Sequence, residues 1–155
     1  MWDIDLPDLE STLALGRALG AVANEGTLVA LRGDLGAGKT SFSQGVGEGL
    51  EVGLPVVSPT FVLMAEYEDG RLPLLHADAY RLKPGETEAI GLDEAVEGWP
   101  GIVLIEWADK IISVLPDDRL SVEMTHKESG RTATVRATGP QHAGVLARWK
   151  QKLNV

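Results

Sequence analysis

Stretches of apolar residues separated by polar turns divide the chain into short strands and helices. Residues 27–31 and 102–105 are almost continuously apolar, which is typical of strands buried on both faces of a parallel sheet. Other stretches alternate apolar and polar residues, as half-buried strands do, and they cover residues 1–6, 61–67, 72–76, 119–125 and 131–138. The first is expected at a sheet edge, and turns predict that the other four pair as two antiparallel hairpins.

Helical spacing of apolar residues predicts the elements between these strands. Asp8 is a suitable N-cap for a first helix, whose apolar stripe comprises Leu9, Leu13, Ala14, Leu19 and Val22. Further helices are predicted over residues 41–50, 86–97 and 141–153, with a short one over 109–115 that Pro116 ends. Gly91 is unfavourable within the helix predicted over residues 86–97.

Residues 33–40 read G-D-L-G-A-G-K-T and lie between a predicted strand and a predicted helix. This is the pattern and the context of a phosphate-binding loop, in which glycines let backbone N–H groups surround an anion. The lysine of this pattern reaches the β- and γ-phosphates, and the hydroxyl that follows it binds Mg²⁺. The residues expected to contact the nucleotide here are Gly33, Leu35, Gly36, Ala37, Gly38, Lys39 and Thr40.

Glu106 follows the apolar run 102–105 directly. An acid at the carboxyl end of a buried parallel strand occupies the position of a Walker B residue, which helps to hold Mg²⁺. The neighbouring Trp107 either shields this site or packs in the core. The strand and loop pattern together predict a single α/β domain over residues 1–155. It is expected to have the three-layer P-loop NTPase-like fold, with parallel strands at the loop and antiparallel hairpins beside them.

Two further segments contain polar residues that suit a nucleotide site. Ser58 and Thr60 flank Pro59 just before an apolar run, so this segment is either a switch loop that contacts Mg²⁺ or the γ-phosphate, or an ordinary turn. Asp78 ends the strand-like segment after the first hairpin turn. It is either a carboxylate that binds metal or orients water, or a loop cap.

Composition narrows the possible partners. The chain has 14 basic and 23 acidic residues, a net charge of −9 and no cysteine. This balance argues against a large nucleic-acid footprint on the chain alone, and the absence of cysteine excludes disulfides and thiolate metal sites. No apolar run reaches the length of a membrane span, and the acidic start does not resemble a signal peptide, so a cytoplasmic protein without membrane attachment is expected.

Four motifs resemble those of the bacterial TsaE (YjeE) ATPases in order and spacing. They are the loop at residues 33–40, S-P-T at 58–60, H-A-D-A-Y-R-L at 76–82 and L-I-E-W at 104–107. The resemblance covers essentially the whole chain. It implies a Mg²⁺-dependent ATPase that supports N6-threonylcarbamoyladenosine modification of tRNA together with a TsaD–TsaB heterodimer. It also implies that the heterodimer carries the transfer chemistry, so that tRNA is reached only through the partner.

The resemblance also implies roles for individual residues. Lys39 resembles the phosphate-binding lysine, Thr40 the Mg²⁺-binding hydroxyl and Glu106 the metal-linked acid. Asp78 resembles a carboxylate that supports hydrolysis, and Thr60 belongs to the switch-like loop with Ser58. The remaining matches are positions beside the nucleotide, namely Trp107, Leu9 and Arg131.

Two other functions remain open for a chain with this loop. A small-molecule kinase would need an acceptor pocket and a catalytic base, and no separate arginine-rich lid is visible in the sequence. A nucleotide-dependent interaction switch would need only a loop that responds to ATP, which the segment around Pro59 allows. No arginine finger is evident within the chain, so hydrolysis by the isolated protein is expected to be slow.

Overall fold

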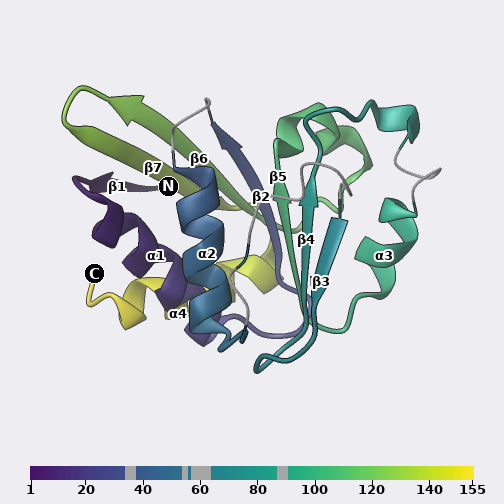
Figure 1. The fold of residues 1–155 in the computed structure, drawn as a ribbon, viewed down its shortest axis with the longest axis horizontal. Coiled ribbons are helices and arrows are strands. Elements are labelled where there is room, and N and C mark those ends of the chain that lie inside the picture. Colours follow the sequence, from purple (N-terminus) through teal and green to yellow (C-terminus); the bar gives the residue numbers. More distant parts are fainter. Residues whose placement is uncertain (34–37, 54–55, 57–63, 87–90) are drawn as a thin grey trace.

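The computed structural model describes residues 1–33, 38–53, 56, 64–86 and 91–155. A seven-stranded mixed sheet runs through the molecule in the order β1-β7-β6-β2-β5-β4-β3 (Figure 1). The strands are β1 (Trp2–Leu6), β2 (Leu28–Gly33), β3 (Met64–Tyr67), β4 (Leu74–Asp78), β5 (Ile102–Glu106), β6 (Leu120–Lys127) and β7 (Gly130–Ala137). Helices cover both faces of the sheet, so the predicted mixed α/β class is confirmed.

The centre of the sheet is parallel. β2 pairs in parallel with β5 on one side and with β6 on the other, and β4 pairs in parallel with β5. The apolar runs predicted as β2 and β5 are buried throughout, from Leu28 to Leu31 and from Ile102 to Ile105, as a parallel sheet covered on both faces requires. The carboxyl ends of β2, β5 and β4 therefore meet at one edge of the sheet.

Antiparallel pairing completes the two sides of the sheet. β6 and β7 form the predicted second hairpin, and β1 pairs with β7 at the edge. β3 and β4 form the first hairpin, in which β4 extends two residues beyond the predicted end at His76. The predicted start of β3, residues 61–63, lies outside the described part of the chain.

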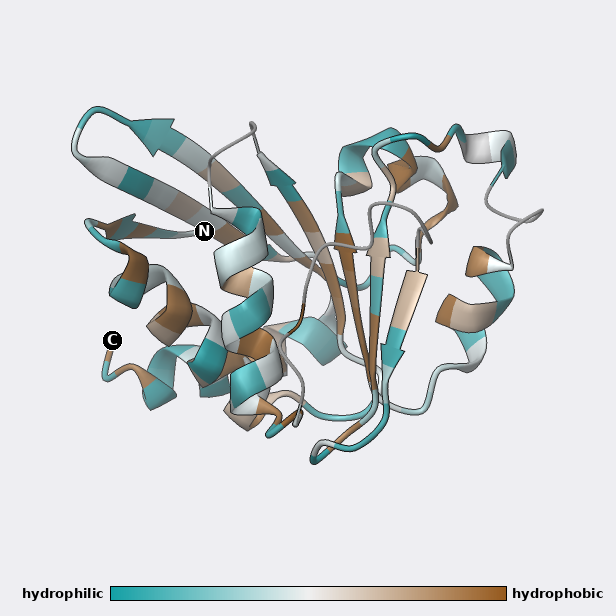
Figure 2. Cartoon of the chain, in the orientation of Figure 1, coloured by the Kyte–Doolittle hydropathy of each residue, from teal (hydrophilic) through white to brown (hydrophobic). Residues whose placement is uncertain are grey.

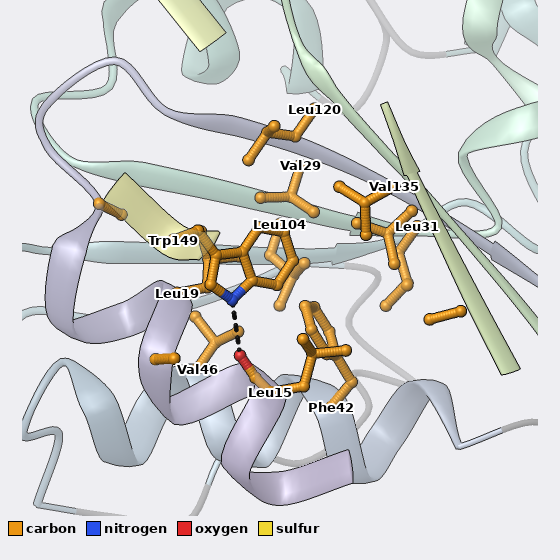
Figure 3. Close-up of a cluster of buried hydrophobic side chains, with 14 of the residues drawn as sticks. Leu15, Leu19, Val29, Leu31, Phe42, Val46, Leu104, Leu120, Val135 and Trp149 are labelled. Carbon is orange, nitrogen blue, oxygen red and sulfur yellow. Dashed lines mark hydrogen bonds between the residues drawn. The ribbon is translucent and has the colours of Figure 1, made fainter. Parts of the chain in front are cut away.

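One face of the sheet is covered by α1 (Leu9–Val22), α2 (Lys39–Gly49) and α4 (Pro140–Lys152). Trp149 of α4 lies at the centre of this core, with its ring 5.3 Å from that of Trp2 and 6.1 Å from that of Phe42. Its indole N–H donates a 3.0 Å hydrogen bond to the Leu15 carbonyl (Figure 3). The bond satisfies the polar atom of a fully buried ring and ties α4 to α1.

The opposite face is covered over β2, β5 and β4 by α3 (Leu92–Gly98) and the segment after β5. Hydrophobic residues are concentrated on β4 and β5, whereas the tip of the β6–β7 hairpin is hydrophilic (Figure 2). α3 begins after Gly91, which has a left-handed φ of 79°, so it covers only the second half of the helix predicted over residues 86–97. Residues 87–90 of that prediction lie outside the described part of the chain. The single short helix predicted over 109–115 is wrong: the chain forms two 3₁₀ turns, Ala108–Lys110 and Ile112–Val114, that are separated at Ile111.

The buried face of α1 differs from the predicted stripe. Leu9 is exposed, and the fully buried positions of this helix centre on Leu15, Gly16, Leu19 and Gly20. The reason is the close approach of α2: a Cβ on Gly16 would lie 2.3 Å from the Phe42 carbonyl oxygen, and a Cβ on Gly20 would lie equally near that of Val46. Glycines rather than large apolar residues therefore define the contact between these helices.

None of the helices in the described part of the chain is long and apolar enough to cross a bilayer.

Candidate nucleotide-binding site

The candidate site lies at the edge where β2, β5 and β4 end (Figure 1). The predicted phosphate loop connects β2 to α2 at this edge, as the strand–loop–helix motif requires. Between β2 and α2, the structure describes Gly33 and Gly38, which flank residues 34–37 of the loop. The predicted contacts Leu35, Gly36 and Ala37 lie outside the described residues.

The two described loop glycines occupy positions that other residues fit poorly. Gly33 has a φ of +152°, and a Cβ there would lie 2.3 Å from the Met124 carbonyl oxygen of β6. Gly38 precedes α2 with a φ of +99°, and a Cβ there would lie 2.9 Å from Cδ of Arg131. At both positions β6 or β7 packs so closely that glycine fits where a side chain would collide.

Lys39 is the first residue of α2 and is only 6% exposed. Its Nζ donates a 2.5 Å hydrogen bond to the Gly33 carbonyl and lies 4.1 Å from the centre of the Trp107 ring. The ammonium group is thus held across the mouth of the loop, between the end of β2 and the end of β5. Thr40 follows on the first turn of α2 with its side chain exposed, so its hydroxyl is accessible to a ligand.

Glu106 is the last residue of β5 and is 2% exposed. In the parallel pairing it lies opposite Asp78, the last residue of β4. Each acid ends a strand, as the sequence predicts, and the structure adds that the two strands are neighbours. One oxygen of Asp78 accepts a 2.9 Å bond from the Tyr80 backbone N–H. This turn cap is one of the two roles that the sequence left open for Asp78.

His76 is the residue that the sequence reasoning missed. It is fully buried on β4, and its Nε2 lies 2.5 Å from Oε2 of Glu106. No local spacing in the sequence marks this pair, because Glu106 is 30 residues away on the neighbouring strand. The usable signal is alternation: a histidine two residues before Asp78 lies on the same face of the strand, toward Glu106.

Trp107 adopts a left-handed backbone conformation, with φ 59° and ψ 36°, directly after Glu106. Such a conformation is uncommon for a bulky residue and turns the chain sharply at the end of β5. The indole ring packs at the margin of the hydrophobic core on the α3 side of the sheet, with its centre 4.8 Å from that of the Tyr80 ring. Nζ of Lys39 lies over the face of the same ring. Trp107 therefore packs against the core and also contacts the lysine of the predicted phosphate loop.

Of the predicted contacts outside the loop itself, Arg131 lies against a loop residue. Arg131 begins the ladder of β7 opposite Leu6 of β1, and its side chain lies against Gly38. Leu9 follows Leu6 by three residues at the start of α1 and is 55% exposed. An exposed apolar side chain of this kind is suited to contact a base. The predicted switch residues Ser58 and Thr60 lie outside the described residues.

The donor set suits Mg²⁺ bound together with a nucleotide. Magnesium prefers oxygen ligands and commonly takes only one or two from the protein when phosphates supply others. Glu106 provides a buried carboxylate, and no described residue bonds its Oε1. Within the described ranges no cluster of three or more histidine, aspartate or glutamate side chains forms a cage of its own. Thr40 and Glu106 therefore fit the ion in its nucleotide-bound form.

Comparisons with known proteins find relatives over most of the chain. A family model described as threonylcarbamoyl adenosine biosynthesis protein TsaE matches residues 6–134. The tRNA threonylcarbamoyladenosine biosynthesis protein TsaE of Nostoc sp. is 46% identical over 133 residues, which span 84% of this chain and 82% of that protein. The protein of the same name from Bacillus subtilis is 42% identical over 134 residues, or 86% of this chain and 84% of that one.

A solved structure shares the fold. The crystal structure of YdiB from Bacillus subtilis superposes with a TM-score of 0.80 at 35% identity, and the match covers 97% of this chain and 93% of that one. The sequence match spans most of the domain, and the structural match extends over nearly all of it. The chain belongs to the TsaE family.

Proposed function

We propose that this protein is a Mg²⁺-dependent ATPase that supports threonylcarbamoyladenosine modification of tRNA. The observation that carries the proposal is the convergence of Lys39, Thr40 and Glu106 at the edge where β2 and β5 end. A phosphate-binding lysine, a hydroxyl and a buried acid at this place are the parts that nucleoside triphosphate hydrolysis needs. The pathway is proposed from membership of the TsaE family and from the names of its relatives.

The chain's own residues have separable tasks in this mechanism. Lys39 exchanges its contact with the Gly33 carbonyl for the phosphates and neutralises their charge. Thr40 and Glu106 would hold Mg²⁺ directly or through water, and a bound ion would supply positive charge beside the phosphate oxygens. Asp78 or Thr60 places the attacking water.

The partner proposed for this chain is a TsaD–TsaB heterodimer. A net charge of −9 disfavours a phosphate backbone as the direct ligand, so tRNA is reached through the partner. No arginine finger is evident in the sequence, and a partner could supply such a group. An arginine finger raises the rate of hydrolysis by about 10³–10⁵-fold. Hydrolysis by the isolated chain is accordingly proposed to be slow.

ATP hydrolysis by the purified chain, measured with Mg²⁺ before and after addition of TsaD–TsaB, tests the proposal. We expect stimulation by the heterodimer, and we expect Lys39→Ala, Thr40→Ala and Glu106→Ala to abolish hydrolysis. Wild-type turnover in Glu106→Ala would remove the metal assignment. Activity that is equal with and without the heterodimer would keep the ATPase but reject the partner, and phosphate transfer to a small acceptor would favour a kinase instead.

A further inference from the structure

Buried against Glu106 is an imidazole to which the proposed function assigns no task. His76 has no exposed surface, and the side chain of Glu106 is 3% exposed. Their contact of 2.5 Å joins β4 to β5 on the face that carries α2. An isolated carboxylate in such a place would be costly, because burial removes the water that solvates it.

The direction of this hydrogen bond follows from the chemistry of its partners. An ionised carboxylate can only accept, so the ring proton belongs on Nε2 of His76, which donates to Oε2. Nδ1 of the same ring is buried and has no hydrogen-bond partner among the described residues. Among the described residues, Glu106 is therefore the hydrogen-bond partner of this buried ring.

We propose that His76 is a positioning residue that fixes the carboxylate of Glu106 for the metal–nucleotide complex. By occupying Oε2, it leaves Oε1 as the oxygen that Mg²⁺ or its water meets, so the carboxylate presents one oxygen in one orientation. The inference rests on the proposed function, because it assumes that Glu106 serves the metal. Partners of this kind orient metal-binding groups, and their loss typically weakens metal binding by about 10–100-fold.

A purely structural role for His76 would have a simpler solution. An apolar residue of similar size would pack between β4 and β5 without leaving a buried nitrogen unpartnered. A hydrogen-bonded pair of buried polar groups specifies one geometry instead of adding much stability. The retained imidazole is thus better explained by the orientation it imposes on Glu106 than by its contribution to the core.

Two variants separate the hydrogen bond from the packing. His76→Gln keeps an amide N–H at the reach of Nε2, whereas His76→Leu keeps the bulk and removes the donor. The measurement is Mn²⁺ binding by electron paramagnetic resonance in the presence of saturating ADP, with ADP affinity in the absence of metal as the control for folding. We expect His76→Leu to weaken Mn²⁺ binding by about 10–100-fold and His76→Gln to retain most of it, with metal-free ADP affinity unchanged in both.

Glu106→Gln in the same assay tests the metal-binding role of Glu106 separately from the positioning role of His76. If Glu106→Gln loses Mn²⁺ affinity but His76→Leu keeps it, the positioning role is wrong and the proposed function stands. If Glu106→Gln binds Mn²⁺ like the wild type, the metal assignment fails and the positioning role fails with it. Should His76→Leu lose metal-free ADP binding through misfolding, His76→Asn replaces it, because its shorter amide does not reach Glu106.

Imidazole NMR tests the geometry without any ligand. Long-range ¹H–¹⁵N spectra show which ring nitrogen carries the proton. His142 is an internal reference, because its proton is expected on the other ring nitrogen. Its Nε2 accepts a 2.8 Å bond from the Leu28 backbone N–H, so its proton must lie on Nδ1, toward Asp118. We expect the proton of His76 on Nε2 and that of His142 on Nδ1. A His76 ring protonated on Nδ1 alone would overturn the proposal, because Nε2 would then have no proton to donate.

Discussion

Lys39 and Trp107 are in direct contact: the ammonium Nζ lies 4.1 Å from the centre of the indole ring. The same Nζ donates to the Gly33 carbonyl, so the lysine bridges the two strands whose ends define the site. A cation over an aromatic face gains about 0.5–2 kcal/mol, depending on how far it is removed from water. The contact holds the charge at the mouth of the loop before any phosphate arrives.

Replacing Lys39 should separate its charge from its packing. Lys39→Ala removes both, and Lys39→Met keeps a long side chain over the ring without the charge. We expect both variants to lose ATP hydrolysis by more than about 100-fold, because each lacks the group that neutralises the phosphates. Thermal unfolding is the control, and Lys39→Met should unfold at a temperature close to that of the wild type. Hydrolysis retained in Lys39→Met would show that the charge is dispensable.

Trp107 offers a test of whether its ring serves the site more than the core. Trp107→Gly removes the ring but also relieves a left-handed backbone conformation that costs a bulky residue about 1–2 kcal/mol. We expect the free energy of unfolding to change by less than about 1 kcal/mol, because this relief offsets much of the lost packing. Hydrolysis should fall about tenfold, since water then reaches Lys39 and weakens its field. Trp107→Phe keeps an aromatic face, so its rate of hydrolysis should lie between those of the wild type and of Trp107→Gly. A loss of more than about 3 kcal/mol in stability would assign Trp107 to the core instead.

The sequence predicts the parts of this site that are encoded locally. The glycine loop and the buried acid of β5 are recognisable because each lies within a few residues of an apolar run. The His76–Glu106 pair is not recognisable in this way, because it depends on which strands become neighbours. The buried face of α1 was misassigned for a related reason: hydrophobicity locates large apolar residues, whereas the contact with α2 is built on glycines.

The glycine contact between α1 and α2 predicts an unusual effect of alanine. Gly16→Ala should destabilise the protein by about 1–3 kcal/mol, because its Cβ meets backbone atoms of α2 that cannot move separately. Alanine is otherwise the better helix residue by about 1 kcal/mol. Gly144→Ala in α4 is the matched control, since its Cβ would approach only the flexible end of Arg148 at 3.6 Å, and it should stabilise. Urea unfolding of both variants measures the difference, and equal effects would contradict the close contact.

Asp118 and His142 predict a pH dependence of stability far from the site. Burial raises the pKa of Asp118, but hydrogen bonds from the His142 side chain and from the backbone N–H groups of Gln141 and His142 outweigh it. The pKa of Asp118 therefore lies below its ordinary value of 3.8 in the folded protein. A lowered carboxyl pKa contributes stability that is fully present above the unfolded value and is lost as the pH falls through the folded one.

Asp118→Asn should accordingly lower the urea midpoint by the same amount at pH 7 and pH 5. The difference from the wild type should narrow only below a pH of about 3.8. Asp117→Asn, at the exposed neighbouring position, is the control and should have little effect at any pH. A difference that already closes between pH 7 and pH 5 would show that another group controls this contact.

Arg131 lies against the loop without being part of it, and this position predicts an effect on binding more than on turnover. Its side chain packs on Gly38 from β7, on the opposite face of that strand from Arg136. Arg131→Ala should raise the KM for ATP about tenfold, equivalent to about 1.4 kcal/mol, with kcat changed by less than about twofold. An interaction that stabilises the bound ground state and the transition state equally raises KM when it is lost and leaves kcat unchanged. Arg136→Ala removes the same charge from the same strand at a distance from the loop, and its KM should match that of the wild type. If the two variants raise KM equally, the effect comes from the net charge of the chain, and the contact with Gly38 has no part in nucleotide binding.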